Sequence, residues 1–145
     1  MFPLADRRFA LPTAEVVELI RTGSIHLFPH TTPGILGVLI RHGRILPVWD
    51  IAPAILGEDE PTLKYCLVAR RNAVAEELTA IPISGDCQLF TTQMEQPPEE
   101  AAAYVRGVLF LAGQLVEVLD LKRLGSLPDP AVAAAGGTMT IEGRA

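Results

Sequence analysis

Two aspartates stand at equivalent places in the two halves of this 145-residue chain, and a pair of carboxylates is an arrangement that could do chemistry. Asp50 and Asp120 each come at the end of an apolar, β-branched run. Two carboxylates that share one proton are the acid and base of aspartic proteases. That chemistry needs a small hydroxyl residue and a glycine after each aspartate, whereas Ile51 and Leu121 follow here. We therefore expect each aspartate to cap a short helix.

Other reactive residues also lack the neighbours that chemistry requires. His26 and His30 have a spacing that binds metal on a helix, but Pro29 between them argues against a helix, so we expect two loop histidines and no metal site. Cys66 and Cys87 match no metal or redox spacing, and we expect buried free thiols. No phosphate-binding glycine loop, nucleophile elbow or zinc-protease helix motif occurs in the sequence. The protein is predicted to be no enzyme and to need no cofactor.

A hairpin signature positions the first aspartate. Ile35–Ile40 and Ile45–Ile51 are apolar, β-branched runs separated by the charged turn Arg41–Arg44. Asp50 then opens one or two helical turns, which Gly57 ends.

The same unit returns seventy residues later, in the runs Tyr104–Leu111 and Leu115–Leu121. Six residues of Gly37–Ile51 recur in Gly107–Leu121, namely Gly37, Val38, Leu39, Gly43, Val48 and Asp50 as Gly107, Val108, Leu109, Gly113, Val118 and Asp120. These are the residues that a hairpin followed by a capped helical turn requires. The chain is therefore predicted to repeat one strand-turn-strand unit.

Shorter runs predict further strands around the two hairpins. For Thr13–Arg21, a helix capped by Thr13 and a turn followed by a strand both fit, and we favour the turn and strand. The other predicted elements are a compressed hairpin at Met1–Pro12, a short strand at Ile25–Phe28, a strand at Leu63–Ala69 with Leu63, Tyr65, Leu67 and Ala69 on one face, and a strand at Ala73–Ile81 that Pro82 ends.

The composition is that of one globular domain, with 49% apolar and 20% charged residues. The net charge of −5 and the scattered basic residues exclude a nucleic-acid footprint. The sequence contains no run of about eighteen apolar residues, so we expect no direct membrane insertion. The first residues do not have the pattern of a secretory signal, and we therefore expect a cytoplasmic location. We predict a single domain over residues 1–126 and a mobile Ala/Gly/Pro-rich tail over 127–145, in which Thr138–Ile141 has the character of a strand that could dock on an open sheet edge.

The segment Ile35–Ile51 resembles the CheW family, in which a strand, a charged Arg-Gly turn and a Pro-Val-x-Asp strand follow one another. Phe9–Pro12 and Val16–Leu19 upstream, and Val116–Leu121 downstream, extend the resemblance over about residues 9 to 125. The resemblance implies an all-β (mainly β) fold of two interlocked, SH3-like, five-stranded barrels with short helical turns. It also implies a non-catalytic chemotaxis adaptor that couples the cytoplasmic tip of a chemoreceptor to the regulatory domain of a CheA-like histidine kinase.

Carried over position by position, the resemblance assigns partner contacts to Val16, Glu18, Gly37 and Val38. His42 stands where the family usually has arginine, and Arg41 precedes it, so both join the predicted partner-binding set. Because a shift of one residue changes the face of a strand, we do not expect Arg41 simply to replace the family's arginine.

These departures, together with the acidic pair Glu76-Glu77, motivate an alternative. In it the protein is a structural or accessory module that has lost the signalling contacts and self-associates through its short first strand.

Overall fold

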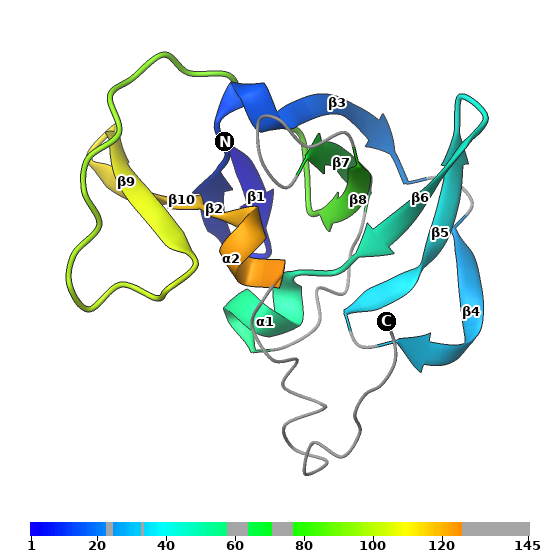
Figure 1. The fold of residues 1–145 in the computed structure, drawn as a ribbon. Coiled ribbons are helices and arrows are strands. Elements are labelled where there is room, and N and C mark those ends of the chain that lie inside the picture. Colours follow the sequence, from blue (N-terminus) through cyan, green and yellow to red (C-terminus); the bar gives the residue numbers. More distant parts are fainter. Residues whose placement is uncertain (23–24, 33, 58–63, 71–76, 126–145) are drawn as a thin grey trace, which may run out of the picture.

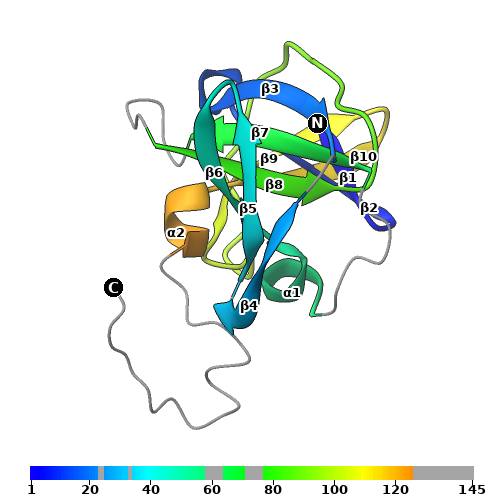
Figure 2. The ribbon, with the colours of Figure 1, turned by 90° about the vertical axis from the view of Figure 1, so that its right-hand side faces the viewer.

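The computed structural model describes residues 1–22, 25–32, 34–57, 64–70 and 77–125. The described residues are mainly β, with ten strands in two sheets (Figures 1 and 2). The four-stranded sheet has the order β1 (Phe2–Leu4), β2 (Arg7–Ala10), β10 (Gln114–Leu119) and β9 (Val105–Leu111). The six-stranded sheet has the order β3 (Val16–Arg21), β7 (Tyr65–Arg70), β8 (Leu78–Ile83), β6 (Arg44–Trp49), β5 (Ile35–Arg41) and β4 (His26–Thr32). The mainly-β prediction is confirmed.

The two sheets interlock because the first strands of the chain pair with the last. In the four-stranded sheet the N-terminal strand β2 lies parallel to β10, from the C-terminal hairpin. The strands are thus divided four and six between the sheets, whereas the family resemblance implied two five-stranded barrels.

The six-stranded sheet is curled. Three strands separate β3 from β5 in the sheet order, yet Arg41 at the end of β5 donates to Glu18 of β3 over 3.0 Å. Two side chains that far apart on a flat sheet could not touch, since neighbouring strands lie about 4.8 Å apart. The curl agrees with the barrel-like shape that the sequence predicted.

The predicted repeat is present residue for residue. The hairpins β5–β6 and β9–β10 have the same bounds seventy residues apart, and Gly37↔Val48 corresponds to Gly107↔Val118 in the strand register. Both turns have two residues with positive φ, 52° and 75° in His42-Gly43 and 49° and 78° in Ala112-Gly113. This is the geometry of a type I′ turn, which matches the twist of the flanking strands.

Both aspartates cap helices, as predicted. Asp50 Oδ1 accepts from the backbone N–H of Ala52 at the start of α1 (Ala52–Leu56), which Gly57 ends at φ 80°. Asp120 Oδ1 accepts from the backbone N–H of Arg123 in α2 (Leu121–Gly125). Neither described α-helix is long and apolar enough to cross a membrane.

The largest core lies between the two sheets and receives side chains from both sheets and both short helices (Figure 1). Strand β7 shows how: Leu67 and Ala69 enter this core, while Cys66 and Val68 enter the core of the six-stranded sheet. A strand buried on both faces has a continuous apolar sequence because each face needs apolar side chains. The predicted face of Leu67 and Ala69, with the half-buried Tyr65 beside them, is confirmed.

Three local predictions need correction. His26 and His30 lie in strand β4, not in a loop, because an edge strand tolerates Pro29. Strand β8 continues through Pro82 to Ile83. It pairs with β6 only at Ala80, so no described strand pairs with the β6-facing edge at Pro82, where a proline is tolerated.

Cys66 is buried as predicted, but Cys87 is half-buried and follows β8 outside the strands. Glu76, Leu63 and the tail from Ser126 onward lie outside the described residues.

Candidate partner-binding surfaces

The rim of the curled sheet brings together three of the six predicted partner-binding residues. Arg41 Nη2 lies 3.0 Å from Glu18 Oε1, and His42 Nε2 lies 3.9 Å from Glu18 Oε2. Arg41 can reach β3 because it shares the inner face of β5 with the buried Leu39. His42 reaches the same carboxylate from the turn, where the backbone no longer alternates as in a strand.

Neighbouring side chains favour the ionised form of Glu18. The hydrogen bond from Arg41 lowers the pKa of Glu18, against a smaller opposing effect of burial. The carboxylate therefore stays ionised at neutral pH and pairs with the Arg41 guanidinium. The His42 side chain is 72% exposed and remains accessible to a partner.

The outer face of the first hairpin is apolar, which the sequence analysis missed. Val38 and Ile40 on β5 pair with Pro47 and Ile45 on β6, and side chains of directly paired residues lie on the same face of a sheet. Ile40 is 62% exposed and Ile45 68%. We call these four residues the outer patch. The available signal was that both alternating sets of Ile35–Ile40 are apolar, although one set must face outward.

Val16 lies elsewhere, on the wall of an apolar cavity of about 230 Å³ near the N-terminus. The cavity is lined by Met1, Phe2, Leu11, Thr13, Val16, Leu67, Cys87, Gln88 and Leu89. Leu89 is 80% exposed at its mouth, so apolar surface continues from the cavity onto the outside. A cavity of this kind accepts an apolar side chain of a partner.

Gly37 is buried within the sheet, where it pairs with Leu27 of β4 and Val48 of β6. Its predicted partner contact stays a prediction, and its neighbour Val38 is the residue of the pair that belongs to the outer patch.

The two aspartates lie at the starts of separate helices, where each carboxylate accepts a backbone hydrogen bond. Neither aspartate lines the apolar cavity. No group of three or more metal-ligating side chains occurs among the described residues.

Comparison with known proteins agrees with this picture. The family model described as CheW-like domain matches residues 1–72. A protein of Rhizobium etli named probable chemotaxis protein CheW is 24% identical over 134 residues, which cover 86% of this chain and 84% of that protein. The crystal structure of the scaffolding protein TtCheW from Thermoanaerobacter tengcongensis matches with a TM-score of 0.74 and 19% identity, over 87% of this chain and 85% of that one. The likeness to TtCheW shows that the fold is shared.

Proposed function

The chain belongs to the CheW-like family, and on that basis we propose that it is a non-catalytic, cytoplasmic adaptor that couples chemoreceptors to a CheA-like histidine kinase in a chemosensory pathway. The observation that carries the proposal is the outer patch, a strand face of apolar side chains left exposed beside the rim that carries the Glu18–Arg41 ion pair. A contiguous exposed apolar patch favours a protein interaction site, and the outer patch joins four apolar residues on two paired strands.

The outer patch is the proposed contact with the regulatory domain of the kinase. Burial of Ile40 and Ile45 against a partner would supply affinity, because central apolar anchors carry most of the binding energy of an interface. The rim charges of Arg41 and Glu18 lie next to the outer patch and would set the orientation of the partner.

The apolar cavity is the proposed contact with the receptor. A helical receptor tip could insert an apolar side chain between Val16 and Leu67 while its next turn covers Leu89. The cavity and the outer patch belong to different parts of the six-stranded sheet and its surroundings, so the proposal gives the two partners separate surfaces.

The decisive experiment is a binding assay of the full chain against the purified regulatory domain of the kinase and against a receptor cytoplasmic fragment, both encoded in the same genome. Ile45→Asp should weaken kinase binding by at least tenfold, since it removes an apolar anchor and desolvates a charge. Phe110→Asp alters the equivalent exposed pair of the second hairpin and is the matched control.

For the receptor, Leu89→Asp should weaken binding, while Phe90→Asp should not, because Phe90 is exposed next to Leu89 but does not line the cavity. If the wild-type chain binds neither partner, the proposal is wrong.

The self-associating accessory module is the second candidate, and the structure gives its proposed route less support. The outer edge of β1 already accepts hydrogen bonds from the backbone N–H groups of Ser84 and Gln88, at Pro3 and Met1. A second copy or the tail would have to displace these bonds to pair with β1. A mass that rises with concentration, in a chain that binds no kinase, would favour this candidate.

A further inference from the structure

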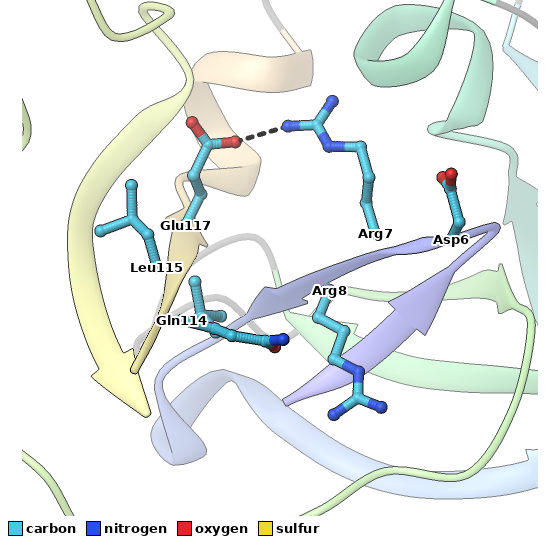
Figure 3. Close-up of a pocket in the computed structure, with 7 residues that line it drawn as sticks. Asp6, Arg7, Arg8, Gln114, Leu115 and Glu117 are labelled. Carbon is cyan, nitrogen blue, oxygen red and sulfur yellow. Dashed lines mark hydrogen bonds and ion pairs between the residues drawn. The ribbon is translucent and has the colours of Figure 1, made fainter. Parts of the chain in front are cut away.

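Strands β2 and β10 lie side by side for only a short distance. Their parallel pairing consists of Glu117↔Phe9 and Val118↔Ala10. Toward their N-terminal ends the two strands separate, and Figure 3 shows β10 diverging from the β1–β2 hairpin there. The space between them is a groove of about 530 Å³, lined by Asp6, Arg7, Arg8, Gln114, Leu115, Val116 and Glu117.

One wall of the groove is an open strand edge. A two-residue turn makes Leu111 and Gln114 a hydrogen-bonded pair, so the backbone groups of Gln114 and Val116 face β9. Those of Leu115 and Glu117 therefore face β2. Glu117 has its partner on β2, but Leu115 has no strand partner on that side among the described residues.

The opposite wall is open in the same way. The two-residue turn after Leu4 makes Leu4 and Arg7 a hydrogen-bonded pair, so the backbone N–H of Arg8 faces β10. In a continuous parallel ladder this N–H would donate to the carbonyl of Leu115. The divergence leaves both groups turned toward the groove, where they can bond to the backbone of an added strand.

The two faces of the groove carry different side chains. On one face Arg7 binds Glu117 over 2.9 Å and lies 4.8 Å from the centre of the Phe9 ring, so its charge is already engaged. Leu115 lies on this face with its cross-strand partner Phe110, and they are 50% and 57% exposed.

On the other face Arg8 is exposed and has no ion pair among the described residues. Asp86 lines a neighbouring cavity of about 90 Å³ together with Arg8, but its Oδ1 accepts from the backbone N–H of Cys87. Figure 3 shows the side chains of Arg7 and Arg8 pointing to opposite sides of the strand.

We propose that this groove binds an extended peptide segment of a partner protein by strand addition, and that it selects an acidic residue flanked by apolar ones. The backbone of the segment would bond to the open edge at Leu115. Because alternate side chains of a strand point to opposite faces, two apolar residues would contact Leu115 and Phe110 while the acidic residue between them meets Arg8. The groove belongs to the four-stranded sheet and does not depend on the outer patch or the apolar cavity.

The test uses the full chain and two synthetic peptides with blocked ends, Thr-Ile-Glu-Val-Thr and its charge-reversed form Thr-Ile-Lys-Val-Thr. Amide NMR spectra report the site, and a titration gives the affinity. The glutamate peptide should shift the amides of residues 6–8 and 114–117 and bind more tightly than the lysine peptide. Arg8→Glu should lower the affinity for the glutamate peptide by about five- to tenfold and raise the affinity for the lysine peptide. An ion pair at a partly exposed site contributes about 1 kcal/mol.

Arg44→Glu is the matched control, because Arg44 is an exposed arginine at a hairpin turn in the other sheet, and it should leave both affinities unchanged. The proposal is overturned if neither peptide shifts the groove amides, or if Arg8→Glu leaves the preference unchanged. Slow hydrogen exchange of the Leu115 amide before any peptide is added would also overturn it, because a segment of the chain itself would then fill the groove.

Discussion

The two hairpins of this protein have the same backbone conformation but different surfaces. Strands β5–β6 and β9–β10 share bounds, register and turn geometry at an offset of seventy residues. In the first hairpin the outward side chains Val38, Ile40, Ile45 and Pro47 are all apolar and at least partly exposed.

The second hairpin keeps only part of this exposure. Val108, the counterpart of Val38, is buried and bonded to Glu95, while Glu117 replaces Pro47 and pairs with Arg7. The duplicated backbone supports the fold, and the first hairpin alone keeps the whole outer patch that we propose as the contact with the kinase.

The segment at residues 94–95, which bonds to the edge of the second hairpin, can be displaced by a change at Gly107. A Cβ at this position would lie 2.5 Å from Met94 Cγ and 2.8 Å from the carbonyl oxygen of Glu95. Gly107→Ala should lower the free energy of unfolding by about 2 kcal/mol, because the segment must move off β9. Urea denaturation measures this loss. Adding Met94→Ala should recover part of it but not all, since the backbone oxygen remains. An unchanged stability for Gly107→Ala would show that residues 94–95 do not clamp this hairpin.

The two turns differ in how well their first residue tolerates a positive φ. Ala112 has φ 49° and His42 has φ 52°. Histidine and asparagine adopt this conformation more readily than alanine does. Ala112→Asn should therefore raise the free energy of unfolding by about 1 kcal/mol, whereas His42→Asn should change it less. Thermal and urea unfolding of both variants make the comparison, and an equal gain at both turns would contradict it.

The buried Glu15, whose ion-pair partner Arg106 belongs to the second hairpin, should make stability depend on pH. Arg106, whose counterpart is Leu36, lies 2.9 Å from the buried Glu15 of the turn before β3 (Thr13–Glu15). Burial raises the pKa of Glu15 above its ordinary value of 4.5, although the hydrogen bond from Arg106 opposes this. The folded protein thus keeps this proton to a higher pH than the unfolded chain does, and this contribution to stability falls as pH rises from about 4.5 through the raised pKa.

Glu15→Gln should remove this decrease in stability with rising pH, while it keeps a hydrogen-bonding side chain beside Arg106. Denaturation at a series of pH values between 4 and 7 compares the slopes for the variant and the wild type. An identical slope would exclude Glu15 as its source.

The smallest expected effect concerns the exposed ion pairs that join strands in each half. Arg41→Met should cost about 0.5 kcal/mol, since a partly exposed pair is screened by solvent. Because Arg41 lowers the pKa of Glu18, this stabilisation is present above pH 4.5 and is lost as pH falls through the lowered pKa. Arg7→Met, which breaks the pair with Glu117, is the matched change in the other sheet. If the loss of stability in either variant is as large in high salt as in low salt, that loss does not come from the ion pair.

Local patterns in the sequence were enough for the hairpins, the repeat and the helix caps. Two apolar runs around a glycine turn have few alternatives to a hairpin, and an aspartate before a short apolar helix has one evident use. The effects of Pro29 and Pro82 were predicted wrongly because only the local sequence was considered. Proline ends a central strand but not an edge strand, and whether a strand has a free edge is a property of the sheet.

The candidate site was predicted in part. The resemblance placed Val16, Glu18, Gly37 and Val38 in the partner-binding set, and the departures from the family pattern added Arg41 and His42. The structure brings Glu18, Arg41 and His42 together at the rim. The outer patch was not foreseen, because all of Ile35–Ile40 is apolar and an unbroken apolar run does not say which face is covered.

The sequence by itself determined that the chain is mainly β, that it repeats one hairpin, that both aspartates cap helices, and that its pattern is similar to the CheW family. These properties depend on residues close together in the chain. Only the tertiary structure decided that Glu18 meets Arg41, that Ile40 and Ile45 stay exposed, and that β2 and β10 separate into a groove. Each of these depends on the curl of a sheet or on pairing between distant strands, which residues near one another in the chain do not specify.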